Sequence, residues 1–393
     1  MFKNRERLER FRLFNPLMLV SMLCLCVMGV LYIYSSCSVR DDLSLQQLYI
    51  RHAEAALLGL LLYGAAAFVN YRRVLAWSWL AYGVILVLLI LVPFIGDSQM
   101  GAKRWLFGIQ PSEPAKLGII MMVAWLYSRR GEKRGFGLFL LTLIIVGIPA
   151  FLILLQPDLG TAMVLVPTLF MMMFAANIAP KLLWGSTFIG VIAAAGLLGL
   201  VYVTETVKMP KERRDALIHA TGLRDHQLRR LQVFMFPDKD LHGSGYNRRQ
   251  SEIAVGSGGF WGKGHNKGEH YMLGYLPPSV SSNDFIFAVL AEEAGFVGTL
   301  MVLLLFLSLT WTGLWVAVRC RDDGGRLFCV GVVTLMFSHT FINIAMTIGL
   351  MPITGLPLPF ISYGRTFMLT MMVALGLVQS VSMYGREPET HFS

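Results

Sequence analysis

Charged residues are scarce in this sequence. Only 15% of its 393 residues are charged, 55% are hydrophobic, and the mean hydropathy is +0.59. Because soluble domains carry about 25% charged residues, this composition excludes an ordinary soluble protein and predicts an integral membrane protein. Cysteine is also sparse. The five cysteines form no C-x-x-C pair, so we expect buried packing thiols rather than a disulfide framework or a thiolate metal site.

The motifs of nucleotide-binding enzymes and zinc proteases are missing. The glycines at 256–268 match neither Walker A nor G-x-G-x-x-G, since Gly262-Lys263 is followed by Gly264 instead of Ser or Thr. H-E-x-x-H does not occur, and His265 and His270 are five residues apart in a predicted loop, which is a weak metal pattern. These absences argue against an ATPase or a zinc protease. The net charge of +10 indicates basic cytoplasmic loops, and we expect no nucleic-acid partner.

Long apolar runs, by contrast, are abundant. A transmembrane helix needs about 20 predominantly apolar residues, and hydropathy indicates about ten such segments. The candidate spans cover residues 14–34, 54–68, 74–94, 115–127, 136–155, 161–175, 182–203, 296–318, 327–350 and 367–383. We therefore predict an all-α, polytopic membrane protein that forms a single domain over residues 1–393.

Loop charge predicts the orientation of these spans. Basic residues precede the first span and recur at every second connection, which places these segments in the cytoplasm. An even number of spans then leaves both termini cytoplasmic and places one large loop, residues 204–283, outside. Within that loop, residues 210–236 have the pattern of an amphipathic helix. Such a helix lies in the headgroup plane, although a solvated basic surface helix fits the same pattern.

Two acidic sites interrupt the apolar segments before residue 160. Glu113 and Lys116 are three apart, so they share a helix face and can neutralise each other. Charges inside spans are costly and mark functional interiors, but a paired bridge that only fixes helix packing fits equally. Asp158 lies in the break between two apolar runs, where it is either an acid exposed on the outer face or the N-cap of the next helix.

Asp284 begins a second acidic segment, at the start of an apolar run that also contains Glu292 and Glu293. If the helix includes all three, Asp284 and Glu292 lie on one face, two turns apart. The alternative is that Asp284 is an ordinary N-cap. Three carboxylates in so short an apolar stretch favour a functional site that faces the outer surface.

The last part of the chain carries a polar stripe and an irregular loop. His339, Asn343 and Thr347 recur every four residues, so we expect them to face the helix bundle, with His339 in a helix–helix hydrogen bond. Residues 355–365 are rich in Pro and Gly. Irregular backbone at membrane depth is tolerated only where it is packed in protein or lines a cavity.

Five blocks in this order resemble the SEDS family of bacterial cell-wall proteins (RodA, FtsW, SpoVE), most closely its RodA branch. The blocks are GAKRW…QPSEPAK at 101–116, QPDLGTA at 156–162, GSGYNRRQSEIAVGSGGFWGKG at 243–264, DFIFAVLAEEAGFVG at 284–298 and PITGLPLPFISYG at 352–364. The resemblance implies a peptidoglycan glycosyltransferase that polymerises lipid II at the outer face of the cytoplasmic (inner) membrane and acts in cell elongation and shape. A lipid II flippase, an FtsW-like division polymerase and a scaffold for a penicillin-binding protein are the alternatives.

The resemblance also implies roles for individual residues. Asp284 matches the essential acid of the family, and Glu113, Lys116 and Asp158 match its other catalytic positions. Removing a proton from the acceptor hydroxyl is general-base catalysis, which suits Asp284. The pyrophosphate leaving group needs neutralising charge, for which Lys116 and the arginines are candidates. The predicted substrate-binding residues are Arg104, Arg248, Arg249, Ser362 and Tyr363, and a divalent cation (Mg²⁺ or Mn²⁺) is expected on Asp284 and Asp158.

Partners follow from the resemblance as well. Lipid II is the expected substrate, a class B penicillin-binding protein the expected crosslinking partner, and MreB, MreC and MreD the expected elongation machinery, together with membrane lipids. Three departures affect how substrate and partner are placed. Residues 278–283 differ from the family pattern, with two residues inserted before Asp284, and Arg365 follows Gly364 where the family has glycine. The loop at 101–110 is also shorter than is usual in the family.

Overall fold

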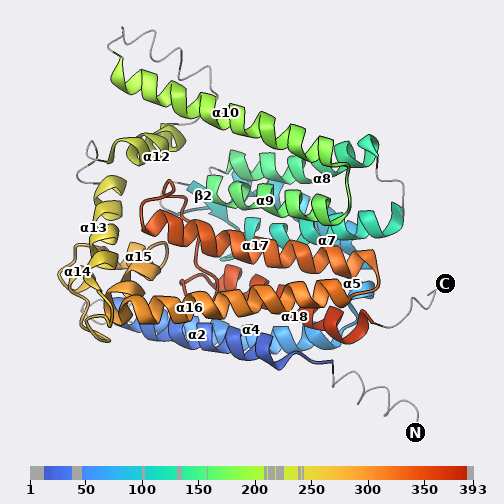
Figure 1. Cartoon of the computed structure of the whole chain (residues 1–393), viewed down its shortest axis with the longest axis horizontal. Coiled ribbons are helices and arrows are strands. Elements are labelled where there is room, and N and C mark those ends of the chain that lie inside the picture. The colour runs from blue at the N-terminus through green and yellow to red at the C-terminus, as the bar shows by residue number, and fades with distance from the viewer. Residues whose placement is uncertain are drawn as a thin grey trace.

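The architecture is a bundle of long helices capped at one end by short ones (Figure 1). The computed structural model describes residues 13–37, 47–99, 102–130, 135–156, 158–207, 210, 217, 225–237, 240 and 243–386. The prediction of an all-α membrane protein is confirmed. The strands found in the described residues are a short antiparallel pair, β1 (Asp97–Gln99) and β2 (Ala102–Trp105).

Every predicted span contains a helix. These helices are α2 (Pro16–Cys37), α4 (Leu48–Phe68), α6 (Ser78–Ile95), α7 (Ser112–Arg130), α8 (Phe136–Leu155), α9 (Leu159–Ala175), α10 (Pro180–Thr206), α16 (Ile286–Arg319), α17 (Asp323–Thr347) and α18 (Arg365–Tyr384). In the described part of the chain, seven are long and apolar enough to cross a membrane: α2, α6, α8, α10, α16, α17 and α18. Helix α9 is apolar but has only 17 residues, and α4 and α7 carry charged side chains.

One predicted span is interrupted. The segment 74–94 is divided at Trp77, where α5 (Tyr71–Ala76) ends and α6 begins. Asn70 caps α5 by accepting a hydrogen bond from the backbone N–H of Arg72 at 3.0 Å. Hydropathy could not show this break, because the residues on both sides of it are apolar.

Helices α17 and α18 form the centre of the bundle. In their most apolar stretches 83% and 78% of the residues are buried, against 11% for α10. Helix α4 packs on α18, α2 packs on α16, and both α7 and α9 pack on α17. Helix α10 lies at the outer edge, where it contacts α9 and α12 (Figure 1). Polar side chains within the membrane are therefore best shielded from lipid on α17 and α18.

The described ends of the chain meet at one end of the bundle. Ser382 Oγ on α18 donates to the carbonyl oxygen of Leu13 at 2.7 Å, just before α2. The short helices α12 (Asp225–Met235), α13 (Ser244–Ser257), α14 (Glu269–Met272) and α15 (Pro278–Ser281) gather at the opposite end (Figure 1). This arrangement agrees with an even number of crossings and with a large loop on the far side from both ends.

The predicted amphipathic helix at 210–236 is present as α12, and most of the rest of that range lies outside the described residues. Its apolar side chains Leu228 and Val233 are 7% and 4% exposed, and it packs against α10 and α13. The apolar face of α12 is therefore covered by protein.

Helix α16 is kinked at Gly295, whose φ is +63°. The backbone of the loop 258–264 packs against this kink through hydrogen bonds. Lys263 N–H donates to Glu292 O at 3.0 Å, and Phe296 N–H donates to Gly259 O at 2.9 Å. A Cβ on Gly295 would lie 2.3 Å from the backbone nitrogen of Gly262. Only glycine permits both this backbone angle and this close approach.

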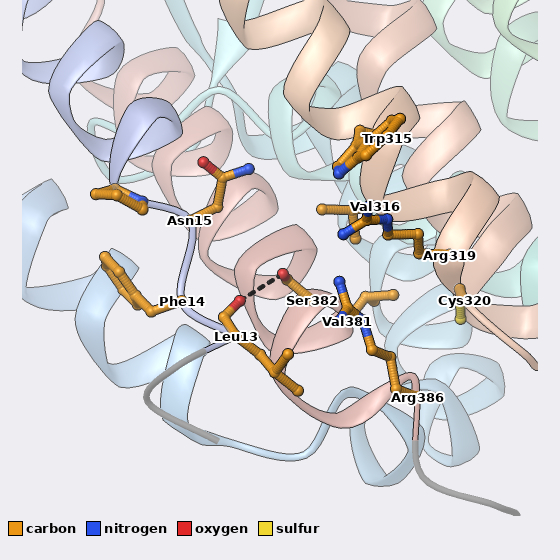
Figure 2. Close-up of a pocket in the computed structure, with 11 residues that line it drawn as sticks. Leu13, Phe14, Asn15, Trp315, Val316, Arg319, Cys320, Val381, Ser382 and Arg386 are labelled. Atoms are coloured by element: carbon orange, nitrogen blue, oxygen red, sulfur yellow. Dashed lines mark hydrogen bonds between the residues drawn. The ribbon is translucent and has the colours of Figure 1, made fainter. Parts of the chain in front are cut away.

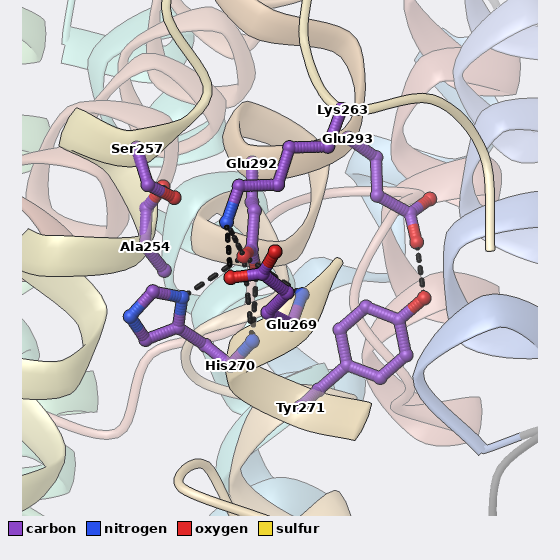
Figure 3. Close-up of polar contacts among 8 residues, drawn as sticks. All are labelled: Ala254, Ser257, Lys263, Glu269, His270, Tyr271, Glu292 and Glu293. Carbon is purple, nitrogen blue, oxygen red and sulfur yellow. Dashed lines mark hydrogen bonds and ion pairs between the residues drawn. The ribbon is translucent and has the colours of Figure 1, made fainter. Parts of the chain in front are cut away.

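The two glutamates before the kink secure the same loop (Figure 3). Glu292 accepts from Lys263 Nζ and His270 Nδ1, each at 2.9 Å. Glu293 accepts from the hydroxyls of Tyr271 and Ser35 and lies 3.1 Å from His265 Nδ1. The prediction that Glu292 shares a site with Asp284 is therefore wrong. Asp284 precedes the first turn of α16, and Glu292 is used to hold the loop.

We expect Gly295→Ala to destabilise the protein by about 2–5 kcal/mol, since it combines a positive φ with a backbone clash. Gly108→Ala is the matched control. Gly108 has a φ of +75°, and a Cβ there would meet nothing within 4 Å, so its cost is limited to about 1–2 kcal/mol of backbone strain. Thermal unfolding in detergent measures both. Equal losses in the two variants would show that the close approach at the kink contributes nothing.

Candidate active site

The backbone around Asp284 is held by α17 and by the loop before α18. Asn343 Nδ2 donates to Asp284 O at 2.9 Å and to Leu356 O at 2.7 Å. Ser362 Oγ donates to Asn283 O at 2.6 Å, and Tyr363 N–H donates to Ser282 O at 3.0 Å. These bonds position the acid from the interior of the bundle. Phe285, not Asp284, is the N-cap residue of α16, so the capping alternative does not describe Asp284.

The irregular loop 350–364 is packed into the protein. The hydrophobic side chains of its second half are at most 1% exposed: Leu356, Leu358, Phe360 and Ile361. Gly160 at the start of α9 permits a close approach, because a Cβ there would lie 2.8 Å from Thr354 O. The loop is therefore packed in protein, one of the two predicted alternatives, and its Gly355 lies beside Asp284.

The carboxylate of Asp284 lies beside two arginines and the backbone of Gly355. A Cβ built on Gly355 would be 3.6 Å from Asp284 Oδ2 and 4.0 Å from Arg230 Nη2. Burial raises the pKa of Asp284, and the positive charges of Arg230 and Arg104 oppose this rise. The net result is a pKa of about 6. A carboxyl group with a pKa near neutrality can exchange protons at working pH.

The sequence analysis missed Arg230 as a site residue. It lies on α12, and its Nη1 donates to Thr354 O at 2.9 Å. Burial and the nearby Arg104 lower the pKa of the Arg230 guanidinium, and Asp284 raises it. Its neighbour Arg229 points outward with a side chain that is 66% exposed. Both arginines belong to the same basic helix pattern, so no local signal distinguishes the inward one.

Arg104 reaches the same cluster from strand β2. Its Nε–H donates to the carbonyl oxygen of Gln156 at 3.1 Å, and Gln156 Nε2 donates to Leu89 O at 2.9 Å. The hairpin β1–β2 thus places the positive charge of Arg104 next to Gln156, two residues before Asp158. The structure brings Arg104 together with Asp284, as the predicted site requires.

Asp158 is the N-cap of α9. Its Oδ1 accepts from Thr161 N–H at 3.1 Å, and its Oδ2 accepts from Thr161 Oγ1 at 2.9 Å and from Ser112 Oγ and Gln110 Nε2 at 3.2 Å each. The side chain is buried. Capping was one of the two predicted alternatives and is the one observed. Four donors already occupy this carboxylate, which leaves little room for a metal ion.

Glu113 and Lys116 form a buried ion pair on α7. Lys116 Nζ lies 2.7 Å from Glu113 Oε2, and the two side chains are 1% and 5% exposed. Lys116 Nζ also donates to His339 Nε2 on α17 at 3.0 Å, which confirms the predicted helix–helix hydrogen bond. His339, Asn343 and Thr347 are all fully buried, so the polar stripe faces the bundle as expected.

The remaining predicted substrate-binding residues have structural roles or lie apart. Arg248 donates to Glu252 Oε1, Phe234 O and Gly349 O at 2.7–2.9 Å. It ties α13 to α12 and to the end of α17, and three of its five N–H donors are used in these contacts. Arg249 lines a separate pocket beside Asp240. Ser362 and Tyr363 hold the backbone before Asp284, and Arg365 is exposed at the start of α18.

The chain is similar to known proteins over most of its length. The profile of the FtsW/RodA/SpoVE family, described as "Cell cycle protein", matches residues 16–387. Peptidoglycan glycosyltransferase MrdB of Escherichia coli K12 is 32% identical over 371 residues, which cover 93% of each chain. Stage V sporulation protein E of Bacillus subtilis 168 is 32% identical over 387 residues, covering 94% of this chain and 97% of that protein.

Solved structures agree with this similarity. A chain from a peptidoglycan synthase complex that coordinates polymerization and crosslinking matches with a TM-score of 0.73 and 27% identity. The match covers 94% of this chain and 98% of that one. The rod-shape-determining protein RodA of Thermus thermophilus has a TM-score of 0.66 and 24% identity, and covers 95% and 98%. The second match supports the fold alone.

A double-variant cycle tests what the buried ion pair does. Lys116→Met leaves Glu113 buried without its partner, which costs about 3–5 kcal/mol. Adding Glu113→Gln removes the remaining charge, and we expect it to restore most of the stability. If Lys116 has the catalytic role that the sequence predicts, the double variant remains inactive although it is stable. Thermal unfolding and glycan synthesis, measured on the same samples, check both statements. Full activity in the stable double variant would show that the Glu113–Lys116 pair only stabilises helix packing.

Proposed function

The chain belongs to the FtsW/RodA/SpoVE family of cell-cycle proteins, and from that membership we propose that it is a peptidoglycan glycosyltransferase. It polymerises lipid II into glycan strands at the outer face of the cytoplasmic membrane. The observation that carries the proposal is the partly buried carboxyl group of Asp284, which lies with Arg230 beside the backbone of Gly355 and within the electrostatic influence of Arg104. A base beside two cations suits a reaction that removes a proton and releases a pyrophosphate.

In this reaction Asp284 is the general base. Its carboxylate accepts the proton of the acceptor sugar hydroxyl as that oxygen attacks the anomeric carbon of the donor, a contribution of roughly 10²–10⁴ in rate. The bond to the lipid pyrophosphate breaks as the new glycosidic bond forms. A single displacement of an α-linked pyrophosphate gives a β-linked product. Hydrogen bonds from Asn343 and Ser362 to the adjoining backbone keep the base in place.

Arg104 and Arg230 hold the leaving group. Guanidinium groups match phosphate oxygens with paired donors, and positive charge placed where negative charge develops lowers the barrier. Both arginines are anchored to backbone carbonyls, at Gln156 and Thr354, so they need little reorganisation. Arg230 takes the role that sequence analysis gave to Arg248.

We retain a divalent cation, Mg²⁺ or Mn²⁺, in the proposal, but with one protein carboxylate as its ligand instead of two. Among the described residues there is no group of three or more His, Cys, Asp or Glu that could hold a metal ion. Magnesium commonly binds through one carboxylate plus substrate phosphates, and Asp284 fits that single role, whereas the Asp158 oxygens are taken by hydrogen bonds. When bound, the ion would neutralise pyrophosphate charge.

The cellular role and partners follow by analogy with the relatives. We propose a class B penicillin-binding protein as the crosslinking partner, since the structural relative belongs to a complex that coordinates polymerization and crosslinking. A RodA-like place in cell elongation, with MreB, MreC and MreD, is the version we favour over an FtsW-like division role. The flippase and scaffold alternatives are separated from the polymerase by the next experiment.

We expect Asp284→Asn to lower glycan synthesis by roughly 10²–10⁴. The assay uses the purified protein with its penicillin-binding partner, whose transpeptidase site is inactivated, and follows fluorescent lipid II with and without EDTA. Glu269→Gln is the matched control, because that carboxylate is 68% exposed in the loop. Asp158→Asn keeps an N-cap acceptor and is expected to retain more activity. Ladders of equal strength from Asp284→Asn would move the base elsewhere. An inactive wild-type complex would favour transport or scaffolding.

The pH dependence gives a second test. The base must be ionised, so synthesis is expected to fall as the pH drops through about 6, the pKa of Asp284. Arg230→Gln removes a cation that holds this pKa down, so the acidic limb moves to higher pH. Arg229→Gln, the outward neighbour on α12, is the control and leaves the limb in place. Profiles of kcat/KM against pH, which report the pKa values of the free enzyme, measure the shift. If the acidic limb of Arg230→Gln stays at the wild-type pH or moves to lower pH, the assigned interaction between Arg230 and Asp284 is contradicted.

A further inference from the structure

A polar pocket lies at the end of the bundle where the described ends of the chain meet (Figure 2). It has a volume of about 260 Å³ and lies between the start of α2 and the ends of α16 and α18. Arg319 and Arg386 line it together with Asn15, Trp315 and Ser382. The part of α16 after its kink, residues 296–319, alone spans about 35 Å between this pocket and the region of Asp284, so the proposed glycosyltransferase chemistry does not use this pocket.

The two arginines in this pocket lack an acidic partner among the described residues. Figure 2 shows both guanidinium groups directed into the same space, opposite the Asn15 amide. The nearest acids in sequence are engaged elsewhere. Asp322 accepts from the hydroxyl of Tyr71 and from Arg72, Cys320 and Gly325. Asp323 pairs with Arg326 at 2.7 Å. Two like charges facing one cavity repel each other until an anion enters.

The pocket lies at the level of the membrane surface. Arg319 is in the last turn of α16, and its Cζ is 4.0 Å from the centre of the Trp315 ring. Trp315 is 45% exposed, and Val318 beside it is 79% exposed, so this side of the pocket faces lipid. Tryptophan favours the interface between headgroups and acyl chains. The basic loops identify this end as the cytoplasmic one, where the leaflet carries anionic lipids.

We propose that Arg319 and Arg386 form a phosphate-binding site for the headgroup of an anionic phospholipid from the cytoplasmic leaflet. The phosphodiester accepts hydrogen bonds from both guanidinium groups. The Asn15 side-chain amide can donate a further hydrogen bond, and the acyl chains extend along the exposed residues of α16. Inorganic phosphate offers the same charge without acyl chains, so the two sources can be separated experimentally.

The test compares phosphatidylglycerol binding in wild type, Arg319→Gln, Arg386→Gln and the double variant. Full-length protein in phosphatidylcholine nanodiscs is titrated with phosphatidylglycerol, and native mass spectrometry counts the retained lipid. We expect each single variant to bind roughly fivefold more weakly, and the double variant to bind more weakly still. Arg129→Gln is the matched control, because Arg129 stacks on Trp125 at the same end of the bundle but lies outside the pocket. It should bind phosphatidylglycerol like the wild type.

A second readout guards against misfolded variants. Phosphatidylglycerol should raise the melting temperature of the wild type but not of the double variant, while the two melt alike in phosphatidylcholine alone. Retention of phosphatidylglycerol by the double variant at wild-type strength would overturn the site. Displacement of the lipid by inorganic phosphate at matched concentration would overturn the lipid assignment and leave a free anion as the ligand.

Discussion

The side-chain amide of Asn343 is the contact on which the candidate active site depends. It is fully buried on the central helix α17 and donates to the carbonyls of Asp284 and Leu356. Carbonyl groups in irregular backbone at this depth have no water to satisfy them, so they need donors from the protein. One amide thus joins the segment before α16 to the loop before α18. The position of Asp284, the proposed general base, is set by the most buried part of the bundle.

Much of the fold could be predicted because its causes are local. Hydropathy located ten helices, and the predicted span 136–155 coincides with α8. Spacing alone found the pair Glu113–Lys116, since residues three apart on a helix must be neighbours. The N-cap role of Asp158 was likewise one of two local alternatives. Bends were harder. The break at Trp77 lies between apolar residues, and the kink at Gly295 follows from a loop that docks from a distance.

The parts of the site that could not be predicted arise from contacts between distant segments. The sequence does not distinguish Arg230 from Arg229 as a site residue. Only the contact between α12 and Thr354, which comes from a distant segment, shows that Arg230 faces the site. Arg248 lies in a motif rich in polar residues, but its three partners come from α12, α13 and the end of α17. Asp284 and Glu292 were expected together because helical periodicity was extended past the true start of α16. Periodicity describes one element and does not say where that element begins.

The charges around Asp284 also suggest how substrate affects the base. Arg104 and Arg230 are balanced by Asp284 and Asp158 before substrate arrives, and both arginines hold the Asp284 pKa below the value that burial alone would produce. A pyrophosphate bound to these arginines offsets their charge, so their pull on Asp284 weakens and the carboxylate becomes a stronger base. In the proposed reaction, the group that must leave therefore activates the group that accepts the proton. Departure of the lipid pyrophosphate then exposes the arginines again and favours release of that proton.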